Sequence, residues 1–124
     1  MQLSHERPDY GFVLRGADAT SARVNDQVLT RSFAIAPDHL LEDWDAPASA
    51  AALEPAHLAP LLALEPELVV LGTGARQVFP PAAALAACLT RGIGIEAMDN
   101  AAAARTYNVL AGEGRRVVVA MLLG

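Results

Sequence analysis

The chain has 124 residues, a hydrophobic fraction of 53% and a formal net charge of −5. Its length lies in the commonest size range for one domain, so we predict a single domain over residues 1–124. The negative charge argues against general nucleic-acid binding, and no apolar run approaches the roughly 20 residues of a membrane span. All nine basic residues are Arg, which excludes mechanisms that depend on a lysine amine.

The charge is unevenly distributed along the chain. Residues 1–71 hold four Arg against eleven Asp and Glu, a net charge of −7, whereas residues 72–124 hold five Arg against three acids, a net charge of +2. The N-terminal MQLSHERPDYG has no basic start followed by an apolar core, so it does not resemble a signal peptide, and we expect a cytoplasmic protein. The single Cys88 excludes a disulfide within the chain.

The first third of the chain has the pattern of short β-strands. Turn-forming residues at Gly16–Asp18 and at Asn25–Asp26 separate short stretches of β-forming residues. The stretch SFAIAP is a further strand that Pro37 closes, and residues 41–44 are compatible with another extended piece. We therefore predict an antiparallel meander at the N-terminus.

The rest of the chain alternates between helical and apolar β patterns. A short helix begins near His57 and ends before Pro66, because a proline such as Pro60 is tolerated only near a helix start. The apolar runs at 68–71, 93–97 and 116–121 are typical of strands that are buried on both faces of a sheet.

Two further helices separate these three strands. The first has Pro81 at its first position and Gly92 just past its end. The second has Asp99 or Asn100 as its N-cap and Gly112 as its C-terminal stop. Because strand–helix–strand alternation is typical of parallel crossovers, we predict an α/β domain with a mixed sheet.

The motif VVLGTGARQVFPP, residues 69–81, is the strongest candidate for a functional site. Glycines such as Gly72 and Gly74, at the carboxyl end of a strand, allow a ligand to approach the backbone around Thr73. Arg76 adds a guanidinium that suits a carboxylate or a phosphate.

Two features weigh against a nucleotide at this loop. Gln77 stands where a dinucleotide-binding motif needs a third glycine, and Pro80 and Pro81 lack the N–H groups that make a helix N-terminus an anion site. Three interpretations stay open: a structural turn, which we favour, a site for a small anion or nucleotide, and a loop that contacts a partner protein. We expect both glycines to serve turn geometry and close packing. We also expect the backbone amides at the rim of the loop to be able to bind a small anion weakly.

Other chemically active residues form no recognisable constellation. His5, His39 and His57 lack a second ligand at metal-binding spacing, and motifs of α/β-hydrolases, P-loops and zinc proteases are absent. We predict no metal, no cofactor and no catalytic residue, and leave enzymatic activity open. Cys88 lies among small apolar residues of a helix, which favours a buried thiol over a nucleophile.

Trp44 is a candidate partner-binding residue. It is the only tryptophan and lies between Asp43 and Asp45. Tryptophan is enriched at binding hot spots, but a Trp that covers the core while its acidic neighbours stay solvated is the interpretation we favour.

The stretches VVLGTG and GIGIEAMDNAAAARTYNVLAGEGRRVVVAMLL resemble a family of unknown function whose domain is called Mth-like. The most specific segments are Gly72–Gly74, the Ala-x-x-Thr-Tyr-Asn motif of residues 103–108, and Glu113–Arg115. The family's eukaryotic relatives include a mitochondrial assembly factor of respiratory complex I and an adipogenesis-associated protein. The resemblance implies a three-layer α/β domain with a mixed central sheet in which one strand runs against the rest, and it implies no established catalytic residues.

Together these observations indicate a non-enzymatic binding or assembly module. Its ligand would be a protein partner or a second copy in a homo-oligomer, and the resemblance links it to respiratory-complex biogenesis. The alternative is a small-anion or nucleotide-binding protein, conceivably an enzyme, that uses the loop Gly72–Arg76.

Overall fold

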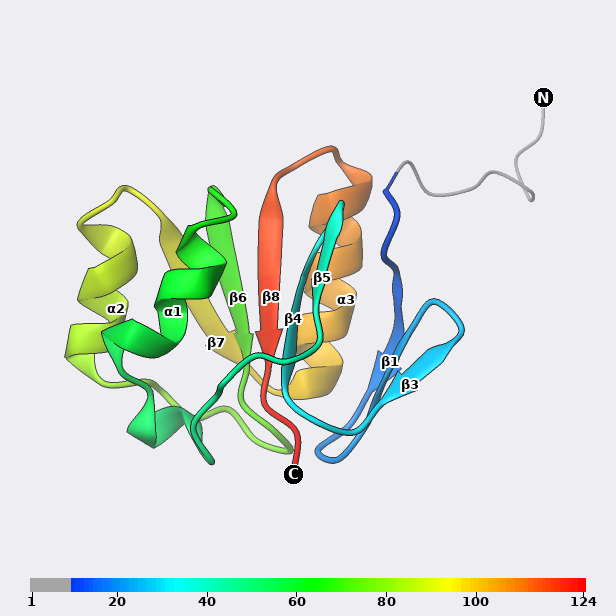
Figure 1. The fold of residues 1–124 in the computed structure, drawn as a ribbon, viewed down its shortest axis with the longest axis horizontal. Helices are drawn as coiled ribbons and strands as arrows, with labels where there is room; N and C mark the ends of the chain where they lie inside the picture. Colours follow the sequence, from blue (N-terminus) through cyan, green and yellow to red (C-terminus); the bar gives the residue numbers. More distant parts are fainter. Residues whose placement is uncertain (1–9) are drawn as a thin grey trace.

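The computed structural model describes residues 10–124, so the N-terminal stretch and His5 lie outside the described residues. A five-stranded sheet with the strand order β5-β4-β8-β6-β7 forms the centre of the molecule (Figure 1). Its strands are β4 (Phe33–Ala36), β5 (His39–Leu41), β6 (Leu68–Gly72), β7 (Gly94–Met98) and β8 (Val117–Met121).

The central sheet is mixed. Strand β6 is parallel to both β7 and β8, whereas β4 is antiparallel to β8 and to β5. Only β4 therefore runs against the other strands of this sheet. The predicted α/β class with a mixed central sheet is confirmed, because the apolar strands and their crossover helices form as their sequence patterns indicate.

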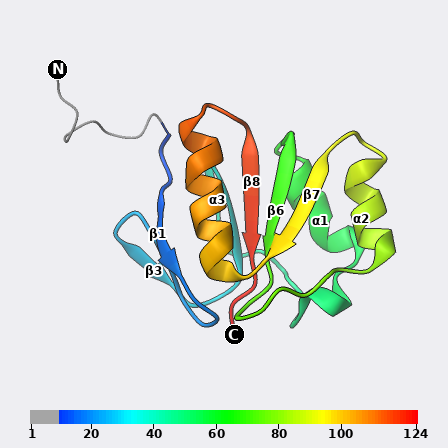
Figure 2. The ribbon, with the colours of Figure 1, turned by 180° about the vertical axis from the view of Figure 1, so that it is seen from behind.

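Further elements cover the two faces of the sheet (Figures 1 and 2). One face carries the 3₁₀ turn η1 (Ala50–Ala52) and the helices α1 (Pro55–Leu62) and α2 (Ala82–Leu89). The opposite face carries α3 (Asn100–Gly112), which also contacts a small antiparallel sheet. The strands of that small sheet are β1 (Leu14–Ala17), β2 (Ala22–Val24) and β3 (Gln27–Leu29).

Two hydrophobic clusters hold these layers together. Val69 and Val118 belong to the cluster on the α1 and α2 side, and Val70 and Val119 belong to the cluster on the α3 side. Strands β6 and β8 thus contribute side chains to both clusters. This double burial is the reason why both strands are continuously apolar in the sequence.

Strand β7 differs from its prediction. It pairs with β6 at one edge of the sheet, and Glu96 at its centre is exposed. The prediction of burial on both faces is wrong for this strand, because α3 lies mainly over β6 and β8. The two sides of β7 are covered unequally: Ile95 and Ala97 pack against the cluster beneath α1 and α2, and Met98 packs against the α3-side cluster, but Glu96 is left exposed.

The N-terminal meander is shorter than predicted. The hairpin of β2 and β3 turns at Asn25–Asp26 as expected, and Asn25 has a φ of 54°. Phe33–Ala36 leaves this meander and joins the central sheet beside β8, where all four residues are buried. The extended piece predicted at 41–44 is instead β5, which ends at Leu41.

Two boundaries of the first two helices differ from their predictions. The helix predicted to start near His57 begins at Pro55, because the Nδ1 atom of His57 accepts a hydrogen bond from the backbone N–H of Glu54 at 2.8 Å. Pro60 lies inside that helix, on its exposed side. Pro81 is the N-cap of α2 rather than its first residue.

The start of α3 is as predicted, and its end is not. Asp99 is the N-cap, and its Oδ1 accepts a hydrogen bond from the N–H of Ala102 at 2.8 Å. Gly112 is still helical and does not stop the helix. The left-handed residue that redirects the chain is Gly114, with a φ of 80°.

We predict that Cys88 is inert in the native protein. Its side chain has no exposed surface, and burial raises the pKa of its thiol despite the opposing charge of Arg91. Mass spectrometry after exposure to a bulky maleimide is expected to show no labelling of the native chain and full labelling in denaturant. Complete labelling of the native chain within the mixing time would contradict the buried position.

Candidate functional site

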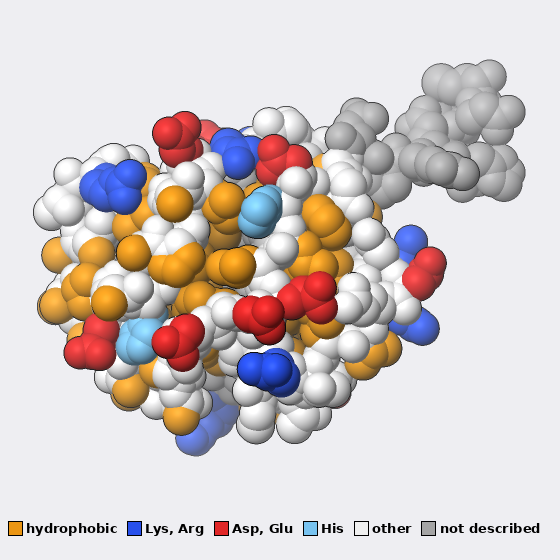
Figure 3. Space-filling model, viewed as in Figure 1, with side chains coloured by type: hydrophobic (Ala, Val, Ile, Leu, Met, Phe, Trp, Pro, Cys, Tyr) orange, Lys and Arg blue, Asp and Glu red, His pale blue; other side chains and the backbone are white. Residues whose placement is uncertain are grey.

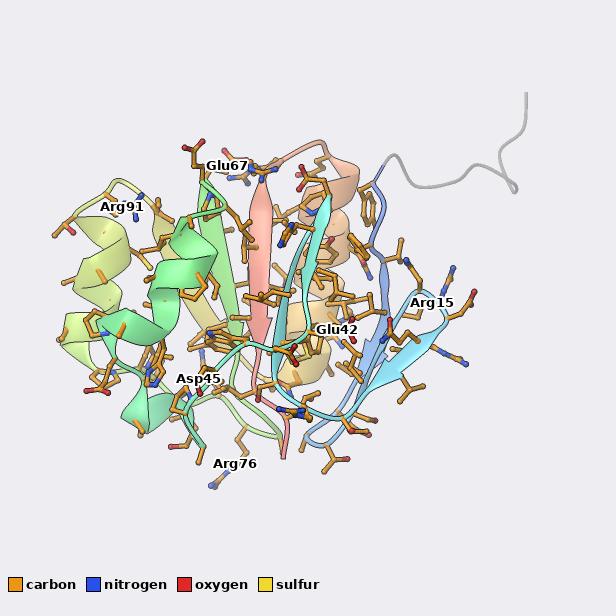
Figure 4. All side chains as sticks on the ribbon, in the orientation of Figure 1. Arg15, Glu42, Asp45, Glu67, Arg76 and Arg91 are labelled. Atoms are coloured by element: carbon orange, nitrogen blue, oxygen red, sulfur yellow. The ribbon has the colours of Figure 1, made fainter. Side chains whose placement is uncertain are left out.

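The Gly-Thr-Gly loop leaves the end of β6 and lies at the carboxyl edge of the parallel strands. Figure 4 shows Arg76 at this edge, with its side chain directed away from the domain. Arg76 is exposed, and within residues 10–124 it forms no salt bridge. The loop thus brings Gly72, Thr73, Gly74 and Arg76 to one edge of the sheet, as the sequence predicts.

The two glycines of this loop have different roles. A Cβ atom on Gly72 would lie 2.6 Å from Oδ1 of Asn100, so Gly72 is required for close packing. Gly74 has a φ of 104° and open space where its Cβ would be, so Gly74 is required for its backbone conformation. The expectation that these glycines serve packing and turn geometry is confirmed, with one role for each residue.

Asn100 is a buried polar side chain behind this loop. Its Oδ1 accepts a hydrogen bond from the N–H of Gly74 at 2.9 Å, and its Nδ2 donates to the carbonyl oxygens of Asp18 and Leu122, both at 2.8 Å. Its own backbone N–H donates to the carbonyl of Gly74 at 2.9 Å. One amide therefore joins the loop, the start of α3, the β1–β2 turn and the segment after β8.

This role of Asn100 was not apparent from the sequence, where Asn100 was only an N-cap candidate. The signal that could have found it is the pair Asp99-Asn100 at one helix start. A single side chain is enough to cap a helix, so the second polar residue needed another explanation.

Thr73 stabilises the loop through hydrogen bonds to neighbouring backbone groups. Its backbone N–H donates to the carbonyl of Met98 at 2.9 Å, and its hydroxyl donates to the carbonyl of Arg76. The same hydroxyl oxygen accepts a hydrogen bond from the N–H of Val78 at 3.0 Å. These bonds occupy groups that a phosphate-binding loop would present to its ligand.

A hollow of about 480 Å³ lies beside the loop. Gly74 and Ala75 are among the residues that line it, and so are Asp18 and Asp99. The N–H groups of Thr20 and Ser21 donate to Asp18 and hold the pKa of its carboxyl below the ordinary value. At neutral pH the hollow therefore carries negative charge.

Trp44 lies in the core, which is the alternative favoured from the sequence. It is 5% exposed, and its Nε1–H donates to the carbonyl of His57 at 2.8 Å. Asp43 and Asp45 on either side are exposed. In this conformation the indole fixes the chain before η1 onto α1 and is almost entirely covered.

The Thr-Tyr-Asn segment of α3 attaches the small sheet. The side-chain amide of Asn108 accepts a hydrogen bond from the N–H of Leu14 at 3.0 Å and donates to the carbonyl of the same residue. The hydroxyl of Tyr107 donates to the carbonyl of Phe12 at 2.6 Å. Asn108 thus pairs with the backbone of β1 as a neighbouring strand would, and Tyr107 binds the segment just before β1, so the motif is structural.

An exposed apolar surface lies over α1 and α2, where Figure 3 shows hydrophobic side chains gathered. Apart from His57 and the buried Cys88, every residue of these two helices is Ala, Leu or Pro. We define the α1–α2 face as the exposed residues of both helices together with Phe79, which precedes α2. Its members are Pro55, Ala56, Ala59, Pro60, Phe79, Ala82, Ala83, Ala86 and Leu89.

This face differs from the outer side of an ordinary surface helix. Such a helix has charged or polar residues on its solvent side, and a helix that is apolar all round is normally covered. Phe79 is 72% exposed and Leu89 is 60% exposed. Large apolar patches mark interaction sites on soluble domains. The α1–α2 face is therefore a better candidate for a binding surface than the Gly-Thr-Gly loop.

The described part of the chain lacks two other kinds of feature. Residues 10–124 contain no group of three His, Cys, Asp or Glu side chains that could hold a metal ion. Across the same range, no helix has both the length and the apolar character needed to cross a membrane.

The three-layer fold places the protein among small α/β domains, and comparison with known proteins gives its family. A family model described as "Protein of unknown function (DUF498/DUF598)" matches residues 14–122. The chain therefore belongs to this family.

Solved structures and one curated protein resemble this chain. A Xanthomonas campestris protein solved by NMR is 58% identical, with a TM-score of 0.84 over 100% of this chain and 93% of that one. A Bordetella pertussis protein described as a Mth938-like domain is 29% identical, with a TM-score of 0.80 over 98% of this chain and 92% of that one. A Francisella tularensis protein named "13 kDa major membrane protein" is 34% identical over 52% of this chain and 53% of its own length.

We predict that Asn100→Ala destabilises the domain by roughly 3–5 kcal/mol. The change leaves the N–H of Gly74 and the carbonyls of Asp18 and Leu122 without their partner in a buried setting. Gln77→Ala is the control, because it removes one exposed hydrogen bond to Ala97 and should cost less than about 1 kcal/mol. Urea unfolding measures the free energy of unfolding of both variants. An equal decrease in the two variants would contradict the role of Asn100.

We predict opposite outcomes for Gly74 and Arg76. Gly74→Val should lower the free energy of unfolding by about 1–3 kcal/mol, since valine is strained at a φ of 104°, whereas Arg76→Ala should change it by less than about 1 kcal/mol.

Calorimetry of the wild-type chain with common mono- and dinucleotides should show no micromolar, saturable binding. Such binding, if lost in Arg76→Ala, would establish a nucleotide site at the loop.

Proposed function

We propose that the protein is a protein-binding module that acts through the α1–α2 face. The observation that carries this proposal is the composition of that face: every fully exposed residue of both helices is apolar, and the half-buried His57 is the one polar side chain on them that reaches solvent. This retains the leading hypothesis from the sequence, a non-enzymatic binding or assembly module, and replaces Trp44 with Phe79 and Leu89 as its anchors.

The energetics favour a protein ligand on this face. Complete burial of a Leu or Phe side chain contributes about 1.5–3 kcal/mol, and Phe79 and Leu89 are both largely exposed. The alanines between them leave a smooth surface that another helix can approach closely. Charged residues stand only at the borders, with Glu54 and Glu65 flanking α1 and Arg91 following α2.

The small-anion or nucleotide alternative has weaker support. The N–H of Gly74 and the hydroxyl of Thr73 are engaged within the protein. Asp18 and Asp99 line the adjacent hollow and repel an anion. An anion held by Arg76 alone would lack the converging donors that give such a site affinity.

An assembly role, in respiratory-complex biogenesis or elsewhere, would use the same face, because an assembly factor must hold other proteins. The cytoplasmic location expected from the sequence stays a prediction, since a related Francisella protein is named a membrane protein.

We predict that Leu89→Glu abolishes partner binding and that Val109→Glu does not. Val109 is a matched control because it is 59% exposed on α3, on the other side of the sheet. Purified chain is immobilised and incubated with extract of the native host, and retained proteins, further copies of this chain included, are quantified by mass spectrometry. A protein retained by wild type and Val109→Glu but lost with Leu89→Glu is the expected result.

Two results would refute the protein-binding proposal. One is an identical set of retained proteins for both variants, and the other is no retained protein with the wild-type chain. Circular dichroism should show equal melting temperatures for the two variants, because each substitution lies on an exposed position.

A further inference from the structure

We propose that the partner on the α1–α2 face is a second copy of this chain, related by a two-fold axis that runs parallel to the helices. In this arrangement α1 of each copy packs on α2 of the other. The inference rests on the proposed function and names the partner of the same surface.

The two helices run in the same direction along the sheet (Figure 1). The chain passes from α1 into β6 and from α2 into β7, and these two strands are parallel. The C-terminal ends of both helices therefore lie at the amino edge of the strands. Glu65 follows α1 at that edge, and Arg91 follows α2 at the same edge.

The helices are flanked by charges of opposite sign. Glu54 precedes α1 and Glu65 follows it, and the sequence contains no Arg between residues 32 and 75. Arg76 precedes α2 and Arg91 follows it, and there is no Asp or Glu between residues 68 and 95. Figure 4 shows these two arginines at opposite edges of the domain.

This charge pattern selects one symmetry. A two-fold axis parallel to the helices exchanges α1 with α2 and keeps their direction, so Glu65 meets the partner's Arg91 at two equivalent places. An axis perpendicular to the helices would place α1 on α1, with Glu54 facing the partner's Glu65. It would also bring Arg91 to the edge that carries the partner's Arg76, and such like-charge contacts are costly.

Self-complementarity is the reason to prefer a second copy over another protein. A two-fold interface requires one surface to carry both halves of each contact, and the α1–α2 face is flanked by acids beside one helix and by arginines beside the other. In the described residues, salt bridges join Arg115 to Glu67 and Arg116 to Asp38, whereas Glu65 and Arg91 form none. Both charges are therefore available to a partner.

The size of the face sets the expected strength of the dimer. Each helix has eight residues and is therefore about 12 Å long, which gives an interface at the small end of specific interfaces. We expect a dimer that dissociates on dilution, so the experiment covers a range of concentrations.

Sedimentation equilibrium of the full chain, from about 10 µM to about 1 mM, is the test. The wild-type chain is expected to dimerise within this range. Arg91→Glu and Glu65→Arg should each raise the dimer Kd at least about tenfold, since each reversal creates two like-charge contacts. The double variant Arg91→Glu/Glu65→Arg should restore the Kd to near the wild-type value, and Arg105→Glu on α3 should leave it unchanged.

Three results would overturn this arrangement: a wild-type chain that stays monomeric up to the highest concentration, charge reversals without effect, or a double variant that does not recover. The capture experiment separates this failure from failure of the proposed function. A monomeric chain that retains a different protein through Leu89 would keep the binding module and reject the second copy. A monomeric chain that retains nothing would reject both.

Discussion

The carboxyl edge of this domain depends on one buried amide. The side chain of Asn100 is the hydrogen-bond partner of three backbone groups, and each group comes from a different segment of the chain. A buried polar group without a partner costs about as much as several ordinary hydrogen bonds contribute, so these segments must converge on this amide. The glycines follow from it: Gly72 leaves space for the amide, and Gly74 turns its N–H toward it.

Helix α3 uses the same chemistry along its length to join the two sheets. Asn108 pairs with both backbone groups of Leu14, and Tyr107 binds the carbonyl of Phe12. The α3 side of the central sheet is therefore held by specific polar contacts as well as by packing. The opposite side is held mainly by apolar packing beneath α1 and α2, and the outer surface of those helices is apolar apart from His57. This asymmetry is the basis of the proposal that the domain binds a partner on its α1–α2 face.

Much of the fold could be predicted from the sequence, and the errors have physical causes. The strands at 68–71 and 116–121 were predictable because their burial on both faces requires every residue to be apolar. The run at 93–97 looks similar, yet its exposure depends on how far α3 extends across the sheet. The Gly-Thr-Gly loop was recognisable as the end of a strand, but Asn100 lies 26 residues beyond Gly74, and no local pattern connects them.

The sequence by itself determined the class of fold, the alternation of strands and helices, and the apolar surroundings of Cys88. These properties depend on the periodicity of neighbouring residues, which a single chain displays directly. Only the tertiary structure decided the separate roles of Gly72 and Gly74, the burial of Trp44 and the exposure of the α1–α2 face. The outer side of an apolar helix is exposed or buried according to whether another layer covers it, and that depends on the arrangement of segments that are far apart in the chain.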